Sequence, residues 1–305
     1  MPEELTDVGR GITICHESFG DPADPSLLLV MGLGMQMVAW PEAFCRELAA
    51  RGFHVTRFDN RDVGHSTHMD IPSPTLRELA TRRFRPEQYT LEDMADDTAG
   101  LIAALELGPV HLVGVSQGGM ISQTLAARRP ELVRSLVSIM SNTGSRITGQ
   151  PTPKVLRSFL KPPPREREAM IEHWTKFFAL IGSQGADPAE VRALADVALE
   201  RNVNPDPRSA ERQLGAQLKS GNRTKALRRI KAPTVVIHGA IDPLVRPSGG
   251  RATAKAIPGS KLITIDRMGH DLPTFAWPQI IDAIVENARR ADATGGERDA
   301  VSAAA

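Results

Sequence analysis

The sequence has few cysteines and almost no excess of charge, and each shortage excludes a class of protein. Its two cysteines, Cys15 and Cys45, are too few for a disulfide framework or a cysteine-based metal cluster. We expect both to be buried thiols, with a single bridge between them left open. Lys and Arg number 37 against 36 Asp and Glu, a net charge of +1. This balance gives no sign of the clustered basic excess that nucleic-acid binding requires.

Long apolar runs are also missing. No run approaches the roughly 20 apolar residues that span a bilayer. The first residues, MPEELTDVGRG, are polar and acidic, and they lack the basic and apolar regions of a secretory signal. We therefore expect a cytoplasmic protein with no transmembrane segment. The 305 residues, 41% hydrophobic and 24% charged, suit one large globular domain with an inserted subdomain.

Short apolar segments alternate with helix-like segments along most of the chain. Continuous apolar runs such as SLLLVM at 26–31 are typical of strands buried on both faces of a parallel sheet. The alternation predicts an α/β fold built of βαβ units around a mostly parallel sheet. The expected strands are 12–16, 26–31, 54–58, 110–115, 135–140, 234–238 and 261–265, and the expected helices are 40–50, 91–107, 120–127, 251–256 and 278–289.

This rhythm breaks between residues 143 and 228. The segment contains a proline-rich stretch and amphipathic helical segments but no convincing buried strand. We expect it to form a helical cap on a core made of residues 1–142 and 229–290. The last residues, 291–305, are small and polar, and we expect them to form a disordered tail.

One serine stands between glycines where a predicted strand turns into a helix. Residues 114–118, GVSQG, fit the pattern G-x-S-x-G. A nucleophile on such a sharp turn projects clear of the sheet, and a Cβ at either glycine would collide with a neighbouring element. The N-terminus of the following helix favours developing negative charge. We predict that Ser116 is a nucleophile, the alternative being a serine that only caps a helix.

A serine hydroxyl needs a general base, and the base needs an acid to orient it. After a G-x-S-x-G serine, the acid and then the histidine are expected late in the chain. Asp242 follows the predicted strand at 234–238, and His270 follows the strand at 261–265. Because the carboxyl ends of parallel strands share one edge of a sheet, both should lie near Ser116. We predict a Ser116–His270–Asp242 triad.

The other histidines are weaker candidates for the base. His111 and His238 lie in apolar strand runs and are expected in the core. His65 and His68 share a loop, but their spacing is weak evidence for a metal pair, and we predict no metal site. His270 alone combines a late position, a loop after a strand and an adjacent glycine.

Other acidic residues have simpler explanations than catalysis. Asp266 and Asp271 are too near His270 in sequence to orient its ring easily, and Asp271 is expected to be a solvated loop or capping residue. The charged segment DNRDVGHS at 59–66 is interpreted as a strand-end turn that braces neighbouring loops.

Acyl transfer also needs donors for an oxyanion. The backbone N–H of Gln117, the residue after the nucleophile, supplies the first. The second is expected in the loop GLGMQ at 32–36, where Leu33 has the right position. A plain tight turn or a phosphate loop are the alternatives, but no G-x-G-x-x-G or Walker pattern follows.

From about residue 12 to residue 290 the sequence resembles the α/β-hydrolase superfamily. The resemblance rests on five motifs that occur in the order typical of that family: VMGLG, FDNRDVGHS, GVSQGG, VIHGAIDPLV and MGHDLP. Two longer segments are similar to the carboxylesterase/lipase branch, which includes aclacinomycin-methylesterase-like proteins. They are YTLEDMADDTAGLIAALEL and APTVVIHGAIDPLVRPSGGRA. The resemblance implies the same triad and oxyanion donors, with no cofactor. Met31 stands where many relatives carry histidine, which leaves the main-chain donor of Leu33 in place.

The resemblance implies a serine hydrolase that cleaves carboxylic esters of small to medium, partly apolar molecules through an acyl-enzyme. Met35, Trp174 and Phe178 are the candidate substrate contacts, although cap aromatics can also serve only to pack the cap onto the core. A cofactor-free perhydrolase or haloperoxidase using the same triad, and a slow-turnover ligand receptor of the same fold, stay open. Dehalogenases and epoxide hydrolases are disfavoured, because they need a carboxylate at position 116. The oligomeric state is open, with a homodimer among the options.

Overall fold

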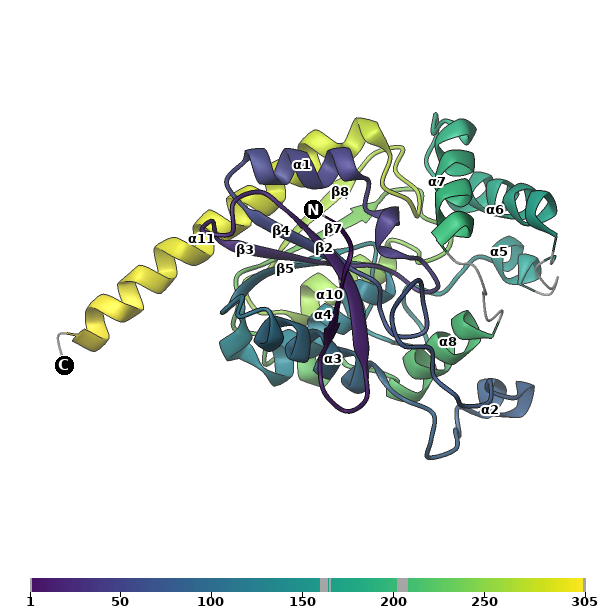
Figure 1. Ribbon diagram of the computed structural model, residues 1–305, viewed down its shortest axis with the longest axis horizontal. Coiled ribbons are helices and arrows are strands. Elements are labelled where there is room, and N and C mark those ends of the chain that lie inside the picture. Colours follow the sequence, from purple (N-terminus) through teal and green to yellow (C-terminus); the bar gives the residue numbers. More distant parts are fainter. Residues whose placement is uncertain (1, 160–163, 165, 202–207, 304–305) are drawn as a thin grey trace.

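The computed structural model describes residues 2–159, 164, 166–201 and 208–303, the side chains of 294–303 excepted (Figure 1). Within these residues an eight-stranded sheet has the order β1-β2-β4-β3-β5-β6-β7-β8. β1 and β2, and β2 and β4, pair antiparallel, and the remaining neighbours pair parallel. The strands are β1 Glu4–Asp7, β2 Thr13–Phe19, β3 Ser26–Val30, β4 His54–Phe58, β5 Val110–Val115, β6 Val133–Ile139, β7 Thr234–Gly239 and β8 Lys261–Ile265.

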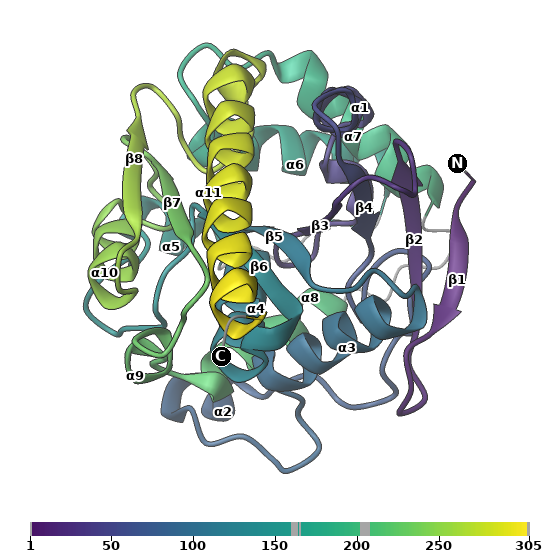
Figure 2. The ribbon, with the colours of Figure 1, turned by 90° about the vertical axis from the view of Figure 1, so that its left-hand side faces the viewer.

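Helices cover both faces of the sheet (Figure 2). Side chains of α1 and α11 pack against one face, and side chains of α3, α4 and α10 pack against the other. Alternate residues of β3 serve the two cores: Leu27 and Leu29 join the first, Leu28 and Val30 the second. This period of two explains why a strand buried on both sides is an unbroken apolar run. These helices are α1 Glu42–Ala50, α3 Leu91–Ala104, α4 Gln117–Arg128, α10 Ser248–Ala256 and α11 Trp277–Ala303.

The predicted α/β-hydrolase architecture is confirmed, and the differences lie at element ends. α1 begins at Glu42 and not at residue 40, because Pro41 precedes it and a 3-10 turn occupies Met37–Ala39. α4 begins at Gln117, directly after Ser116. Outside residues 143–228, one strand and one α-helix were not predicted: β1, which is mostly exposed, and the short α2, Leu76–Thr81, which has no buried residue. Neither shows the apolar periodicity that marks a core element.

Between β6 and β7 the described residues form helices and no strand. This helical insertion, residues 143–228, lies at one end of the molecule in Figure 1. Its helices are α5 Pro153–Ser158, α6 Arg167–Ile181, α7 Pro188–Arg201, α8 Ser209–Ser220 and α9 Thr224–Leu227. The assignment of this insertion as a cap stays a prediction, and of its proline-rich stretch 161–166 the residues 161–163 and 165 lie outside the described residues.

The helix α11 continues beyond its predicted end at residue 289. Its backbone is helical to Ala303, Ala291 is buried, and Arg134 donates a hydrogen bond to Asp292. The predicted tail therefore begins as helix in the structure. Residues 304–305 and the side chains from 294 onward are outside the described residues, so a disordered tail stays a prediction. No helix in the described part of the chain is long and apolar enough to cross a membrane.

Both cysteines are buried and free. Burial raises the pKa of the Cys45 thiol to about 12 and also raises that of Cys15. The interpretation of two buried thiols is therefore confirmed, and the alternative of a bridge between them is wrong.

Candidate active site

Ser116 occupies a strained turn between β5 and α4. Its φ of 52° and ψ of −119° place it in a region that L-residues rarely adopt. The flanking glycines make the turn sterically feasible: a Cβ on Gly118 would lie 2.1 Å from the Val30 carbonyl oxygen, and one on Gly114 would lie 2.4 Å from that of Gly118. A Cβ at either position would therefore collide with a neighbouring element, as the sequence analysis predicts. Ser116 stands at the N-terminus of α4, where the helix dipole favours negative charge.

Three predicted residues come together in one hydrogen-bond chain. The Oγ of Ser116 lies 3.0 Å from Nε2 of His270, and Nδ1 of the same ring lies 2.7 Å from Oδ2 of Asp242. With the Nδ1 proton donated to the carboxylate, Nε2 is left to accept the serine proton. Asp242 is buried, His270 is 8% exposed and Ser116 is half-buried. These residues follow β7, β8 and β5, at one edge of the sheet.

The Asp242 carboxylate is held by backbone groups as well as by His270. Its Oδ1 accepts hydrogen bonds from the amides of Leu244 and Val245, at 2.9 and 2.8 Å. Nearby, His238 donates from Nε2 to the Val245 carbonyl oxygen at 2.6 Å, and burial lowers the pKa of His238. His238 is therefore a neutral core residue, as expected, and the charge of Asp242 faces the His270 ring.

The loop after β3 lies beside Ser116. A Cβ on Gly32 would be 3.2 Å from the Ser116 Cβ, and Met35 N donates to the Gly32 carbonyl to close a turn. Gly34, with φ of 70°, supplies the left-handed conformation that this turn requires. Neither the Leu33 amide nor the Gln117 amide has an acceptor among the described residues. The role of these two N–H groups as oxyanion donors stays a prediction.

Helix α8 contributes a buried glutamine that sequence reasoning missed. Gln213 accepts a hydrogen bond from Gly34 N at 2.7 Å and donates one to the Arg61 carbonyl at 2.7 Å. The backbone carbonyl oxygen of Gln213 accepts a hydrogen bond from Nε2 of the Gln117 side chain at 2.8 Å. One residue of the insertion therefore binds the backbone of the loop at Gly34 and the side chain of Gln117.

The turn at 59–66 braces its surroundings, as interpreted from the sequence. Asp59 accepts from Met37 N at 2.7 Å and pairs with Arg201 of α7 at 2.9 Å. Asp62 pairs with Arg212 of α8, and both side chains are almost fully buried. The turn thus ties the insertion to the core and contributes no group to the hydrogen-bond chain of Ser116.

The expectation that Asp271 is a solvated or capping residue is wrong. Its carboxylate is partly buried and accepts hydrogen bonds from the backbone and hydroxyl of Ser183, just past α6. Burial raises the pKa of Asp271. His270 N also donates to the Ile181 carbonyl oxygen at 2.8 Å. The end of α6 is therefore attached to the loop that carries His270.

The three candidate substrate contacts lie on two segments. Met35 is half-buried in the loop after β3 and packs against the core. Trp174 and Phe178 are half-buried and four residues apart on α6, so they share a helix face. The Phe178 ring packs edge-on against Phe177 at a centroid distance of 6.1 Å. The role of these three residues as substrate contacts stays a prediction.

One cluster of side chains of the kinds that bind metal ions occurs among the described residues, and Ser116 is not part of it. Ligand atoms of Glu3, Cys15 and His65 lie within 4.8 Å of one another. The Arg201 guanidinium binds Glu3 at 2.7 Å and lies 3.9 Å from the Cys15 sulfur. Although burial alone would raise it, hydrogen bonds from Arg201 and His65 lower the pKa of Glu3 to about 2. A guanidinium already occupies the place of a cation, so the group is an ion-pair network.

A family model for the alpha/beta hydrolase fold matches residues 25–274, and the chain belongs to this family. Among curated proteins it is similar to rhodomycin D methylesterase DauP of Streptomyces sp. strain C5, at 28% identity over 92% of this chain and 96% of that one. It is also similar to BpoC of Mycobacterium tuberculosis, named for non-heme bromoperoxidase activity, at 27% identity over 86% and 91%. A structure of a thermophilic esterase from Thermogutta terrifontis shares the fold, with a TM-score of 0.70, 22% identity and coverage of 95% and 99%.

Proposed function

We propose that the protein is a serine hydrolase that cleaves carboxylic esters, with Ser116, His270 and Asp242 as its catalytic triad. The observation that carries the proposal is the continuous hydrogen-bond chain from Ser116 Oγ through the His270 ring to Asp242. Two free amides beside Ser116 support it, because acyl transfer develops negative charge on the carbonyl oxygen. The methylesterase relatives support an ester as the substrate.

In the proposed reaction, Ser116 Oγ attacks the ester carbonyl while Nε2 of His270 takes the hydroxyl proton. Asp242 keeps the ring in the tautomer that can accept this proton and stabilises the imidazolium. The amides of Leu33 and Gln117 bind the oxyanion. The C–O bond then breaks, the alcohol leaves with the proton from His270, and an acyl-enzyme stays on Ser116. Water gives a proton to His270, attacks the acyl group and releases the acid, and the proton returns to Ser116.

Within this proposal Gln213 is a positioning residue. It binds Gly34 N, next to the Leu33 peptide, and its backbone holds the side chain of Gln117. A donor pair contributes most when it is fixed before the charge develops. Gln213 is fully buried and comes from the insertion, so the position of α8 sets the geometry of the oxyanion site.

The acyl or alcohol part of the ester is proposed to be partly apolar. Trp174 and Phe178 of α6, and Met35 of the oxyanion loop, supply apolar surface at half-buried positions. The end of α6 is attached to the His270 loop through Ile181, which keeps this helix near the triad. Selectivity for the substrate therefore resides mainly in α6.

Hydrolysis of p-nitrophenyl esters tests the proposal. Ser116→Ala should lower the turnover number by about 1,000-fold or more, because loss of a triad member leaves only binding and the oxyanion site. Ser122→Ala is a matched control, since Ser122 lies on α4, the helix that follows Ser116, is buried and has no side-chain hydrogen-bond partner among the described residues. Full activity in Ser116→Ala would overturn the assignment.

A second candidate is a perhydrolase reaction, in which peroxide replaces water as the acyl acceptor. The similarity to BpoC favours testing it. Bromination of monochlorodimedone with acetate, hydrogen peroxide and sodium bromide measures this activity beside ester hydrolysis on the same preparation. Bromination faster than ester cleavage would make peroxide the preferred acceptor.

A further inference from the structure

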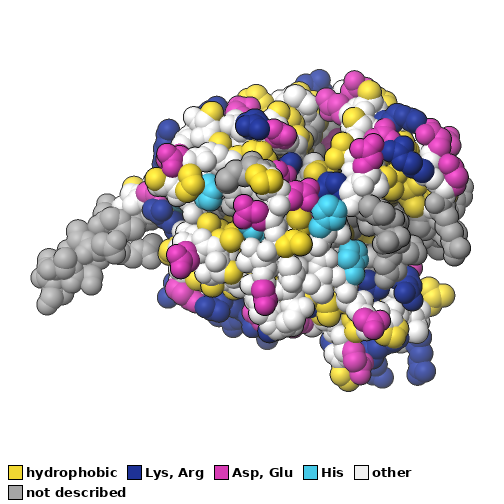
Figure 3. Space-filling view, viewed as in Figure 1, with side chains coloured by type: hydrophobic (Ala, Val, Ile, Leu, Met, Phe, Trp, Pro, Cys, Tyr) yellow, Lys and Arg dark blue, Asp and Glu magenta, His cyan; other side chains and the backbone are white. Residues whose placement is uncertain are grey.

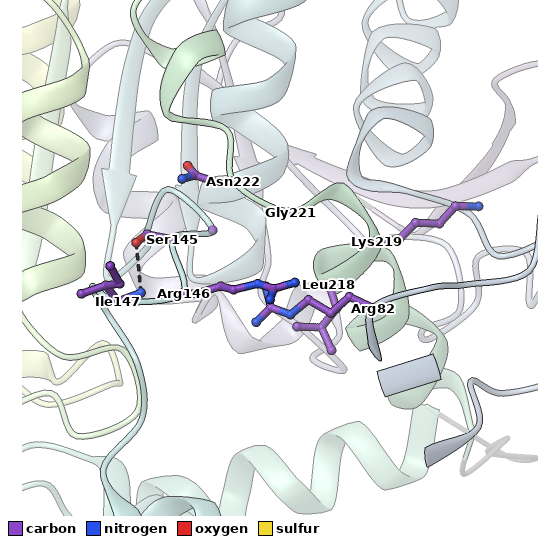
Figure 4. A pocket seen from close by; sticks show the side chains of 9 residues that line it. Arg82, Ser145, Arg146, Ile147, Leu218, Lys219, Gly221 and Asn222 are labelled. Carbon is purple, nitrogen blue, oxygen red and sulfur yellow. Dashed lines mark hydrogen bonds between the residues drawn. The ribbon is translucent and has the colours of Figure 1, made fainter. Parts of the chain in front are cut away.

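A cavity of about 420 Å³ lies at the base of the insertion (Figure 4). Its walls come from the segment that enters the insertion, 144–147, from the segment that leaves it, 218–222, and from Arg82 at the end of α2. None of its lining residues belongs to the hydrogen-bond chain of Ser116. The volume is within the range of small-molecule sites, roughly 300–1,000 Å³.

The entering and leaving segments touch each other beside this cavity. A Cβ on Gly144 would lie 2.0 Å from the Gly221 carbonyl oxygen, and both glycines have positive φ. Arg223 N donates to the Thr143 carbonyl oxygen at 2.7 Å, just beyond the contact. The two segments are therefore held together, and the cavity has a backbone framework that does not depend on a ligand.

The cavity is lined by cations and by no acidic residue. Arg82, Arg146 and Lys219 all line it. The ammonium of Lys219 already donates hydrogen bonds to the carbonyl oxygens of residues 85, 86 and 88. In Figure 4 the Lys219 side chain points away from Arg82 and Arg146. Neither the Arg82 side chain nor the Arg146 side chain has a hydrogen bond or ion pair among the described residues, although the Arg82 backbone amide donates to the Glu78 carbonyl oxygen. Burial and the positive charge of Arg146 lower the pKa of Arg82.

Buried arginines among the described residues have oxygen partners, and those of Arg223 are the Asn142 carbonyl and the Gln123 side chain rather than an acid. Arg57 pairs with Glu17, and Arg212 pairs with Asp62. Arg82 is half-buried and Arg146 is exposed, and their guanidiniums repel each other across the shared cavity, so an anion between them would relieve the repulsion. Arginine is the side chain best shaped to bind phosphate or carboxylate through two parallel hydrogen bonds.

The remaining polar groups of the cavity are donors as well. The Ser145 hydroxyl oxygen accepts from the amides of Ile147 and Thr148, which leaves its own hydrogen to donate. The Asn222 carbonyl oxygen is occupied by Thr224, so its NH₂ group is the part available to a ligand. Ile147, 85% exposed, and Leu218 add an aliphatic wall. Such a lining matches an oxyanion attached to a short aliphatic group.

We propose that this cavity binds a small organic oxyanion, a phosphate or carboxylate bearing a short aliphatic chain, between Arg82 and Arg146. The guanidiniums bind the oxyanion, Ser145 and Asn222 donate further hydrogen bonds, and Ile147 and Leu218 contact the chain. Because Arg82 follows α2 and Arg146 belongs to the insertion, the bound anion links these two parts. The site is independent of the proposed ester hydrolysis.

Isothermal titration of the full chain with butyl phosphate and with inorganic phosphate tests the proposal. Ionic strength is held constant with sodium chloride, because salt screens surface charge. We expect saturable binding of one butyl phosphate per chain. Arg82→Met or Arg146→Met should weaken it at least tenfold, and neither substitution removes a hydrogen bond within the described residues. Ile147→Ser should remove most of the preference for butyl phosphate over phosphate.

Arg83→Met is the matched control, since Arg83 is exposed, adjacent in sequence and absent from the cavity lining. It should bind butyl phosphate as the wild type does. Equal weakening in Arg82→Met and Arg83→Met would overturn the proposal and indicate an adventitious surface-charge effect. Binding to phosphatidylglycerol vesicles without binding of butyl phosphate would also overturn the proposal, because the protein would then bind the phosphate headgroup only at a membrane surface.

Discussion

Helix α8 and the α6–α7 pair belong to the same insertion, but they are joined to the core by different interactions. α8 is attached through buried polar side chains, Arg212 to Asp62 and Gln213 to Gly34. α6 and α7 are joined to each other by surface ion pairs, such as Arg192 with Glu168 at 2.6 Å. Figure 3 shows acidic and basic side chains side by side over these two helices. α8 is therefore anchored near its middle by buried side chains, whereas α6 and α7 contact the core at their C-terminal ends, through Ile181 and Arg201, and each other through surface ion pairs.

The largest effect is expected from breaking the buried ion pair of α8. Arg212→Met leaves the Asp62 carboxylate buried without its cation, and this should lower the free energy of unfolding by about 3–5 kcal/mol. Chemical denaturation at neutral pH measures the change. Adding Asp62→Asn should recover part of the loss, since the unpaired charge is then gone. A loss below about 1 kcal/mol in Arg212→Met would mean that α8 is not anchored by this pair.

The next effect concerns catalysis rather than stability. Gln213→Leu removes the hydrogen bonds to Gly34 and Arg61, so kcat for ester hydrolysis should fall about 10- to 100-fold while KM changes little. Gln217→Leu, one turn further along α8, is the matched control. Labelling of Ser116 by a fluorophosphonate shows whether the triad itself is intact. An unchanged kcat in Gln213→Leu would refute the positioning role.

A smaller, selective effect is expected on α6. Trp174→Ala should raise KM for octanoyl esters by about tenfold and leave acetyl esters within about twofold, because only the longer chain would contact the lost apolar surface. The exposed Lys176→Ala on the same helix is the control. If acetyl and octanoyl esters respond equally to Trp174→Ala, α6 does not shape the acyl site.

The smallest effect is expected at the surface of the α6–α7 pair. Arg192→Gln breaks an exposed ion pair with Glu168 and should leave the denaturation midpoint close to that of the wild type, because both side chains are solvated. Ester hydrolysis should be unaltered. A loss comparable to that of Arg212→Met would remove the contrast between the two parts of the insertion.

Much of the fold could be predicted because its signals are local. The apolar runs at β4, β5 and β8 match the predicted strands residue for residue. β1 and α2 were missed because they bury almost nothing and carry no periodic apolar pattern. Ser116, Asp242 and His270 were predicted from motif, chain order and position after strands, and the hydrogen-bond chain joins all three.

The support around these residues could not be read from the sequence. Gln213 lies 179 positions from Gly34, and nothing in its local pattern distinguishes it from other glutamines on an amphipathic helix. Asp271 was expected in solvent because its partner Ser183 lies in the insertion, whose docking no periodicity predicts. Contacts of this kind are set by tertiary packing, which is why a sequence shows the reacting groups before it shows what holds them.

Reaction with a fluorophosphonate, read by intact mass, tests the central claim most directly. A nucleophile activated by His270 should add one phosphonyl group to the wild-type chain, and none to Ser116→Ala under the same conditions. His270→Ala should react far more slowly while keeping the serine. A single adduct that persists at the same rate in Ser116→Ala would contradict the account, because the reactive nucleophile would then lie elsewhere.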